Sequence, residues 1–241
     1  MKYLIFADCH YGYDQGAKVS IVDVVDMYID MFGSVGKVLV LGDHIELWRR
    51  TVSDVLIECG DVIDDLECMD VVYVKGNHDF IIDELLSNRD IDIVLRYEKE
   101  KYVFEHGHYI DYLSADMPFI GIDDYDNFAR EMCYSNTTIG SFLSRLWSCH
   151  KLLSVKINSI LSRRGYLMRK KFEKMDALSS VLCGRDRKLV VGHFHSLWIG
   201  KNVIALPSFS DNYFASLDSD GLAIYRYDVS GGVTEIKSLS V

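Results

Sequence analysis

Short apolar runs alternate with longer segments of helical periodicity in the first third of the chain. The runs at residues 4–7, 37–41 and 71–74 are rich in apolar residues and predict buried strands. Between them, residues 19–32 and 52–68 place apolar side chains three or four positions apart, which predicts helices. Strands joined by helices of this length indicate crossover connections and a largely parallel sheet. In such sheets, ligands bind at the carboxyl ends of the strands.

The pattern changes after a short predicted helix at residues 81–86. Residues 92–97 and 101–105 predict a hairpin or adjacent strands, and residues 123–182 are mostly helical. We interpret 123–182 as an insertion within one domain that spans residues 1–241. Further strands are expected at 188–191, 198–206, 222–227 and 233–239. Their short connections favour antiparallel pairing, and Gly231-Gly232 predicts the turn between the last two.

Composition predicts a folded protein of the cytoplasm. Hydrophobic residues make up 49% of the chain and the mean hydropathy is +0.05, which argues against disorder. No apolar run approaches the roughly 18 residues of a membrane span, and the first strand turns acidic at Asp8, too early for a signal peptide. The cysteines form no C-x-x-C pair, so reduced and mostly buried thiols are expected.

The net charge of −10 argues against unspecific nucleic-acid binding. The charge is uneven, however. Residues 145–174 carry nine basic side chains and one acidic side chain, so this segment has a charge of +8 and the rest of the chain −18. Two interpretations are open. The segment is a solvated helical face, or it is a basic lid or docking surface for an anionic substrate or a membrane surface.

Histidines are the most informative residues of the chain, because seven of the eight lie in five short clusters that each follow an apolar run. Only His150 lies elsewhere. Aspartate or asparagine accompanies several of the histidines, which indicates a metal site. The clusters are Asp8-Cys9-His10, Gly42-Asp43-His44, Gly76-Asn77-His78-Asp79, His106-Gly107-His108 and Gly192-His193-Phe194-His195.

Oxygen and nitrogen donors of this kind suit Mn²⁺, Fe²⁺ or Zn²⁺. The clusters offer more ligands than one octahedral ion needs, whereas two ions roughly 3.5–4 Å apart would use them with one bridging carboxylate. Asp43 is well placed to bridge, since it follows a strand. His193 and His195 are two residues apart, so on extended backbone they share a face and each can take one metal.

The order D-x-H, G-D-x-x-E, G-N-H-D, H-G-H and G-H-x-H resembles that of the calcineurin-like metallophosphoesterases, and the five motifs span nearly the whole chain. The resemblance implies an α/β fold, a four-layer α/β/β/α sandwich with a helical insertion, and a dinuclear metal centre between its sheets. It assigns one metal to Asp8, His10 and His195. It assigns the other to Asn77, His106 and His193, with Asp43 as the bridge.

The same resemblance assigns catalytic roles. His78 is expected to stabilise the transition state or protonate the leaving oxygen. Asp79 is expected to orient the ring of His78. His108 is expected either to contact the substrate phosphate or to complete a turn. For His44 a place in a loop near the metals is expected, and for His150 a structural role.

A closer likeness concerns residues 42–48, which are similar to a segment of the UDP-2,3-diacylglucosamine pyrophosphohydrolases. Those enzymes also carry a basic helical insertion. This chain has His78 and His108 where they usually have arginine and aspartate, so the likeness implies their architecture and leaves the substrate open.

The sequence therefore predicts a phosphohydrolase with two divalent ions, Mn²⁺ first and Fe or Zn as alternatives, acting on a small phosphoester, phosphodiester or pyrophosphate. One alternative is a pyrophosphatase for a lipid-linked nucleotide that contacts the membrane surface through residues 140–175. Another is a non-catalytic scaffold on the same fold. A nuclease is a weaker alternative, because the acidic net charge disfavours nucleic-acid binding.

Overall fold

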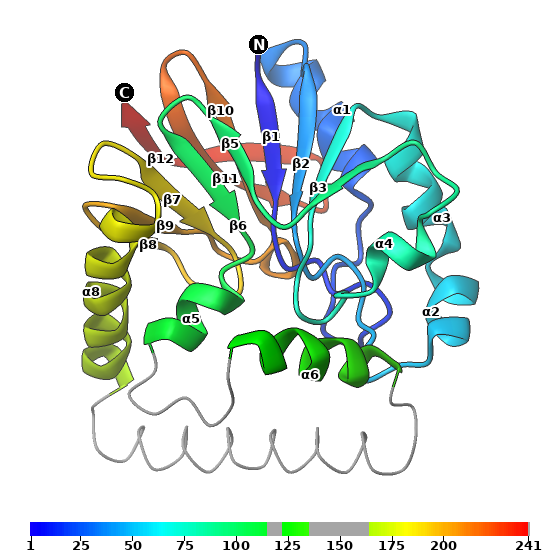
Figure 1. Cartoon of the computed structure of the whole chain (residues 1–241). Coiled ribbons are helices and arrows are strands. Elements are labelled where there is room, and N and C mark those ends of the chain that lie inside the picture. Colours follow the sequence, from blue (N-terminus) through cyan, green and yellow to red (C-terminus); the bar gives the residue numbers. More distant parts are fainter. Residues whose placement is uncertain (115–121, 135–163, 241) are drawn as a thin grey trace.

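Two β-sheets pack face to face at the centre of the protein, with helices on both outer sides (Figure 1). The computed structural model describes residues 1–114, 122–134 and 164–240. The strands of the seven-stranded sheet are β1 (Tyr3–Phe6), β2 (Lys37–Leu41), β3 (Val71–Val74), β4 (Asp92–Val94), β10 (Tyr213–Asp218), β11 (Gly221–Asp228) and β12 (Gly232–Ser240). Those of the five-stranded sheet are β5 (Tyr97–Lys99), β6 (Tyr102–Glu105), β7 (Lys188–Val191), β8 (Trp198–Ile199) and β9 (Val203–Ala205).

The helices fall into two groups. One group packs its apolar residues on the outer face of the seven-stranded sheet: α1 (Ile21–Phe32), α2 (Val52–Glu58), α3 (Gly60–Asp64), η1 (Asp65–Cys68) and α4 (Ile82–Leu85). Helix α6 (Ile122–Tyr134) adds Ala129 and Cys133 to this core but runs past the carboxyl ends of the strands (Figure 1). The other group covers the outer face of the five-stranded sheet: α5 (His108–Ser114) and α8 (Arg164–Leu182). A short 3₁₀ turn, η2 (Phe209–Asp211), leads into β10.

Alternation along the strands builds these layers, because successive side chains point to opposite faces of a sheet. In β1, Leu4 and Phe6 belong to the helix-side core, whereas Tyr3 and Ile5 lie between the two sheets. Both faces of the central strands are therefore buried, which explains why these strands consist of continuous apolar runs. The result is the four-layer α/β/β/α arrangement expected from the sequence.

Strand direction separates the two halves of the seven-stranded sheet. β1, β2, β3 and β4 are parallel, as the crossover pattern predicts. β10, β11 and β12 continue the sheet from the other side of β1 in antiparallel fashion. The turn expected at Gly231-Gly232 joins β11 to β12.

The antiparallel expectation is wrong for β7 and β9, which pair in parallel because residues 192–202, including β8, carry the chain back before β9 begins. β6 pairs with the other side of β7, also in parallel. The long helical segment between β6 and β7 supplies the crossover that a parallel pair requires. The strand expected at 92–97 is two strands, because the chain passes there from one sheet to the other. The strand expected at 198–206 is the short hairpin β8–β9.

Two other elements differ from the prediction. Strand β10 was not predicted, because its sequence YFASLD shows no clear alternation. The single helix expected at 52–68 is broken into α2, α3 and η1, because the backbone at Cys59 is not helical and Gly60 follows it.

The predicted insertion at 123–182 is described only in part. Its two described helices, α6 and α8, flank residues 135–163, which lie outside the described residues and carry four of the nine basic residues of 145–174. Within the described part of the chain, the longest helices are too short or too polar to cross a bilayer.

The interface between the sheets should dominate stability. Ile204 on β9 is fully buried there, so we expect Ile204→Ala to lower the free energy of unfolding by about 2–5 kcal/mol, through lost burial and the cavity it leaves. Ile236→Ala is the matched control, because Ile236 is 48% exposed on β12 and should change stability by less than about 0.5 kcal/mol. Urea denaturation followed by circular dichroism measures both, and equal losses would contradict this packing.

Candidate metal centre

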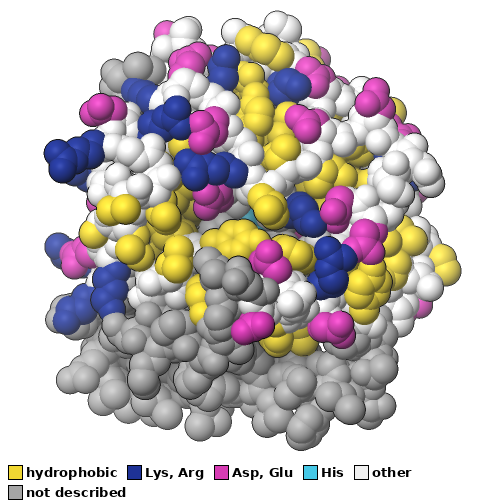
Figure 2. Space-filling view, viewed as in Figure 1, with side chains coloured by type: hydrophobic (Ala, Val, Ile, Leu, Met, Phe, Trp, Pro, Cys, Tyr) yellow, Lys and Arg dark blue, Asp and Glu magenta, His cyan; other side chains and the backbone are white. Residues whose placement is uncertain are grey.

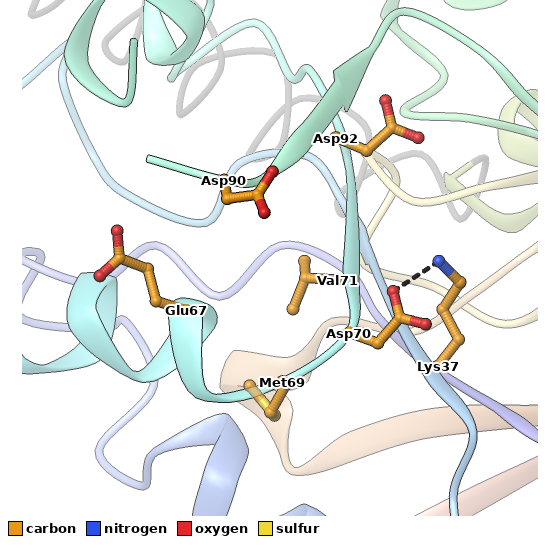
Figure 3. Close-up of a pocket in the computed structure, with 7 residues that line it drawn as sticks. All are labelled: Lys37, Glu67, Met69, Asp70, Val71, Asp90 and Asp92. Carbon is orange, nitrogen blue, oxygen red and sulfur yellow. Dashed lines mark hydrogen bonds and ion pairs between the residues drawn. The ribbon is translucent and has the colours of Figure 1, made fainter. Parts of the chain in front are cut away.

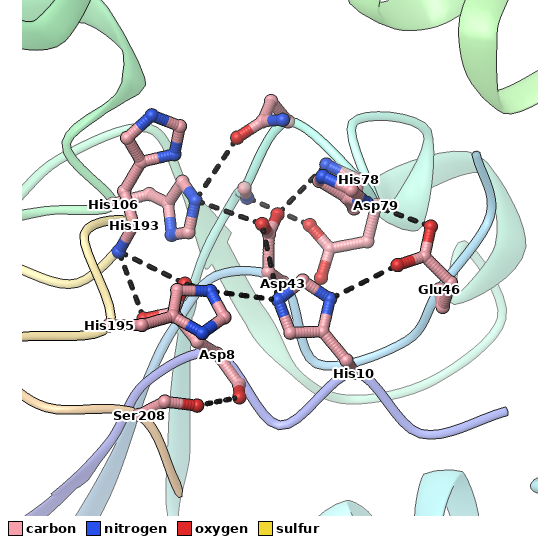
Figure 4. Close-up of polar contacts among 12 residues, drawn as sticks. Asp8, His10, Asp43, Glu46, His78, Asp79, His106, His193, His195 and Ser208 are labelled. Atoms are coloured by element: carbon pink, nitrogen blue, oxygen red, sulfur yellow. Dashed lines mark hydrogen bonds and ion pairs between the residues drawn. The ribbon is translucent and has the colours of Figure 1, made fainter. Parts of the chain in front are cut away.

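The predicted ligands meet where strands from both sheets end (Figure 4). Asp8 follows β1, Asp43 follows β2 and Asn77 lies just beyond β3 in the first sheet. His106 and His193 follow the parallel strands β6 and β7 of the second sheet. The carboxyl ends of five strands thus bring together side chains that are far apart in the chain, as expected for ligand sites in sheets of this kind.

Left-handed backbone conformation is concentrated at this point. Only a few per cent of residues other than glycine have positive φ, and each costs about 1–3 kcal/mol. Seven such residues occur in the described part of the chain, and five of them are predicted metal ligands: Asp8, His10, Asp43, His193 and His195. These conformations turn the side chains at the strand ends toward one shared space.

Two glycines permit the close approach of these loops. A Cβ atom on Gly76 would lie 2.2 Å from Oδ1 of Asp43, and one on Gly42 would lie 2.6 Å from Nδ1 of His106. Gly42 also has a φ of +75°, which favours glycine in its own right. The glycines that precede Asp43 and Asn77 are therefore required by the packing of the ligand loops against one another.

Asp8, His10 and His195 form the first group of donors. Nε2 of His10 lies 3.3 Å from Nε2 of His195, which is 3.5 Å from Oδ1 of Asp8. Their donor atoms all lie within 4.8 Å of one another. The Asp8 carboxylate also accepts the backbone N–H of His193 at 2.9 and 3.0 Å, which joins this group to the loop after β7.

Asp43, His106 and His193 form the second group, whose donor atoms also lie within 4.8 Å of one another. Nε2 of His106 is 3.2 Å from both Oδ2 of Asp43 and Oδ1 of Asn77. Nδ1 of His106 is 2.8 Å from the carbonyl oxygen of Leu41, so an Nδ1–H would donate to it and leave the Nε2 lone pair for a metal.

Asp43 contacts both groups through one oxygen. Its Oδ2 lies 3.2 Å from Nε2 of His106 and 3.9 Å from Nε2 of His10. Its Oδ1 accepts the backbone N–H of His78 at 2.8 Å, which fixes the orientation of the carboxylate. A bridging ligand needs this position between two donor sets.

The charges of the buried groups fit a cation site. Burial alone would raise the pKa of Asp43, but the neighbouring charges of His106 and His78 hold it well below its usual range. Burial opposes the charged form of His106, yet Asp43 and Asp8 raise its pKa to about 10. Burial raises the pKa of Asp8 to about 6. Buried carboxylates are stable only when a positive charge compensates them, and here either a proton or a metal ion can do so.

His78 stands beside the first group, with its ring held on three sides. It is stacked on Trp48, with ring centroids 4.3 Å apart and an angle of 18° between the planes. Its Nδ1 lies 2.8 Å from Oε1 of Glu46, and its ring meets that of His10 edge-on at 5.0 Å.

The carboxylate that orients His78 is therefore Glu46 and not Asp79, which corrects the sequence-based expectation. Asp79 is fully buried and accepts hydrogen bonds from the backbone N–H groups of Gly76 and His44 and from the hydroxyl of Tyr73. It holds the G-N-H-D loop in shape. It therefore fixes the shape of the loop that carries His78.

Glu46 was part of the G-D-x-x-E motif, but no role was predicted for it. Its side chain is buried, and its two oxygens face different histidines: Oε1 faces His78, and Oε2 lies 3.3 Å from Nδ1 of His10. Arg49 supplies the compensating charge at 2.6 Å. Burial would raise the pKa of Glu46, but His78 and these partners hold it far below the usual range, so the carboxylate stays ionised. One carboxylate thus contacts a predicted metal ligand, His10, and the predicted catalytic histidine, His78.

His108 is buried, and neither of its ring nitrogens has a hydrogen-bond partner among the described residues. Its ring stacks on Tyr125 of α6, with an angle of 14° between the planes, and lies 5.5 Å from the ring of His106. The phosphate contact predicted for His108 thus stays a prediction. His44 is also buried, between Tyr11 and Tyr73, and His150 lies outside the described residues.

Asp111 is a second residue for which the sequence predicted no role, and it lies outside all five motifs. It lies on α5, and its Oδ2 is 3.0 Å from Nε2 of His193. In the sequence, the only sign of this role is that Asp111 follows His108 by three residues, which is about one helical turn.

A separate pocket of about 410 Å³ lies at the opposite ends of the strands (Figure 3). Its carboxylates are Glu67, Asp70, Asp90 and Asp92, and Lys37 binds Asp70 at 2.6 Å. It contains no histidine and shares no residue with the donor groups.

Comparisons with known proteins found distant structural likenesses only. No family model matches the chain, and no curated protein sequence matches it. A conserved uncharacterized protein from Streptococcus pneumoniae, described as a predicted phosphoesterase, is 16% identical, with a TM-score of 0.40 and coverage of 98% of this chain and 97% of that one. The nuclease MPE of Pseudomonas putida is 14% identical, with a TM-score of 0.44 and coverage of 97% and 87%.

A dimetal phosphatase from Danio rerio is also 14% identical, with a TM-score of 0.46 and coverage of 93% and 95%. Likenesses at this level do not establish the activity of this chain. Evidence for an activity has to come from its own residues.

Metal binding should release protons. Because the pKa of His106 is raised to about 10 by Asp43 and Asp8, its imidazole is protonated at pH 7.5 and must lose that proton to bind a metal. We expect the release of roughly one proton per chain from this group and an apparent affinity for Mn²⁺ that rises with pH from about 7 to 9. Titration calorimetry in two buffers of different ionisation enthalpy measures this. An observed heat that is independent of the buffer would contradict it.

Proposed function

We propose that this protein is a metal-dependent phosphohydrolase that uses two divalent cations. The observation that supports it most strongly is the position of Asp43, whose one carboxylate oxygen faces two separate groups of histidine and acidic donors. Two ions held by Asp8, His10 and His195 and by Asn77, His106 and His193, with Asp43 shared, would satisfy every donor of both groups. The substrate is a phosphoester, a phosphodiester or a pyrophosphate.

The donor set favours a particular range of metals. Imidazole nitrogens with carboxylate and amide oxygens suit Mn²⁺, Fe²⁺ and Zn²⁺, and we propose Mn²⁺ as the first choice. When bound, such a pair of ions lowers the pKa of a shared water and neutralises charge on a phosphate. His78 lies beside the first group of donors, with its ring 5.0 Å from that of His10, so it would stand next to that chemistry.

His78 is the proposed proton donor to the leaving oxygen. Glu46 binds its Nδ1, so Nε2 is the nitrogen that remains for a substrate oxygen. Stacking on Trp48 holds the ring plane, so that little rearrangement is needed during the reaction. Asp79 supports this role indirectly, because it shapes the loop that carries His78.

The activity test uses simple chromogenic esters. Purified protein with Mn²⁺ should hydrolyse bis-p-nitrophenyl phosphate or p-nitrophenyl phosphate, and EDTA should abolish the hydrolysis. Asp43→Ala should remove activity, because it removes the shared ligand. His78→Ala should lower kcat by about 10²–10⁴-fold with metal content unchanged, because a general acid contributes that much.

Asp126→Asn is the control variant, since Asp126 lies on helix α6, outside the donor groups, and accepts a hydrogen bond from the hydroxyl of Tyr109 on α5. Full activity in Asp43→Ala protein would contradict the proposal. Two bound metals without turnover of any phosphate compound would favour the non-catalytic scaffold instead.

The lipid-linked alternative depends on residues 140–175, of which 140–163 lie outside the described residues. Within the described part, Lys171 pairs with Asp111, and Arg169 lies 2.9 Å from Glu173. At least these two cations thus have acidic partners within the chain. On the face shown in Figure 2, basic side chains are interspersed with acidic ones, and histidine surface is visible only as a trace at the centre.

Vesicle binding tests this alternative. If it holds, the protein should sediment with phosphatidylglycerol vesicles, and the double substitution Lys151→Glu and Lys156→Glu should weaken this binding, since each basic residue near an anionic surface contributes about 1 kcal/mol. Lys201→Glu, on the turn between β8 and β9, and Lys237→Glu, on β12, form the matched control. No binding of the wild-type protein would remove the lipid-linked substrate from consideration and leave the hydrolase proposal untouched.

A further inference from the structure

Asp111 connects a proposed metal ligand to helix α8. One oxygen, Oδ2, lies 3.0 Å from Nε2 of His193, and the other, Oδ1, is paired with Nζ of Lys171. We propose that Asp111 is a positioning residue that makes His193 bind metal through Nδ1, and that Lys171 holds Asp111 in the required orientation. The proposal rests on the metal centre described above and extends it to a residue outside the histidine motifs.

The chemistry of imidazole gives the first step. A neutral ring has one N–H group and one lone pair, so a carboxylate that accepts a hydrogen bond from Nε2 leaves the lone pair on Nδ1. His193 belongs to the same donor group as Asp43 and His106. His106 has the opposite arrangement, because its Nδ1 faces the carbonyl of Leu41 and its Nε2 faces Asp43. Each ring thus has one nitrogen fixed by the protein and the other left for the metal.

The type of acceptor distinguishes the two histidines. A carbonyl orients the ring of His106, whereas a carboxylate both orients a ring and makes it a stronger ligand. Asp111 can do this because its two carboxylate oxygens face two different donors, Nε2 of His193 and Nζ of Lys171. The loss of Asp111 should therefore weaken the metal bound by His193 more than the metal bound by His10.

Helix α8 fixes Lys171 relative to the ligand loop. Nζ of Lys171 lies 5.3 Å from the ring centroid of Phe194, the residue after His193, and Phe172 packs against the same ring at 5.1 Å. One turn further, Asp176 of α8 accepts backbone N–H groups from residues 201–203 at 2.7–2.9 Å. Helix α8 thus contacts the loops of the five-stranded sheet at two places, and these contacts fix the position of Lys171.

The Lys171–Asp111 pair is partly exposed, with side-chain exposures of 34% and 26%. Such pairs contribute little to global stability. Its effect should therefore be seen in the orientation of Asp111 and, through it, in metal affinity. A change in metal affinity without a change in the free energy of unfolding therefore distinguishes a positioning role from a purely structural one.

Calorimetric titration of the metal-free, full-length protein with Mn²⁺ tests the proposal. For the wild-type protein we expect two bound ions. Asp111→Asn and Asp111→Ala should weaken one of the two sites by about 10–100-fold, the size found for outer partners of metal-bound histidines, and change the other by less than about twofold. Asp126→Asn, on the neighbouring helix α6, is the control and should bind as the wild type does.

Lys171 gives the decisive comparison. Lys171→Met should weaken the same site by about 2–5-fold, the size expected of an exposed pair. Because Lys171 acts through Asp111, the double variant Asp111→Asn, Lys171→Met should bind as Asp111→Asn alone does. Lys201→Met is the control, since Lys201 is exposed on the turn between β8 and β9. Additive losses in the double variant would contradict the coupling.

The tautomer provides a readout independent of affinity and activity. In the Zn²⁺-loaded protein, long-range ¹H–¹⁵N spectra should show His193 protonated at Nε2 and bound at Nδ1. Binding through Nε2, or wild-type affinities in both Asp111 variants, would overturn this proposal alone. A wild-type protein that takes up no metal would overturn both this proposal and the proposed function.

Discussion

The buried carboxylate of Asp43 is the group around which the rest of the site is arranged. A carboxylate so deeply buried is stable only if positive charge and hydrogen bonds compensate it. The compensation comes from both sheets: the backbone of His78 from the first and the ring of His106 from the second. The two sheets must therefore pack in one register, because a shift between them would leave this carboxylate without its partners.

The inter-sheet core makes that register possible. Tyr3, Ile5 and Leu39 of one sheet pack against Phe104 and Ile204 of the other. This apolar layer ends where the loops with the predicted ligands begin. The carboxyl ends of the parallel strands of both sheets therefore lie next to one another at this edge. The left-handed residues at those ends are costly, and burial of the layer beneath offsets that cost. The strands thus supply most of the stabilising burial, whereas the strained backbone conformations lie in the loops that carry the predicted ligands.

Much of this arrangement follows from the sequence. The alternating apolar runs predict the parallel strands, and the position of Asp8 and Asp43 after such runs predicts that they meet. The outer partners are harder to predict. Glu46, three residues after Asp43, contacts His78 and His10 through the fold of its loop. Asp111 reaches His193 because Ile110 of α5 packs in the same core as Leu189 and Val191 of β7. Contacts that depend on the packing of two elements leave no spacing signal in a single sequence. Strand β10 was missed for a related reason, since its place beside β1 is set by pairing and not by its own pattern.

Anomalous diffraction from crystals grown with Mn²⁺ tests the central claim most directly. Two peaks about 3.5–4 Å apart should lie on either side of Asp43, one against His10 and His195 and the other against His106 and His193. An absence of peaks at this carboxylate, in crystals that bind manganese elsewhere, would contradict the account.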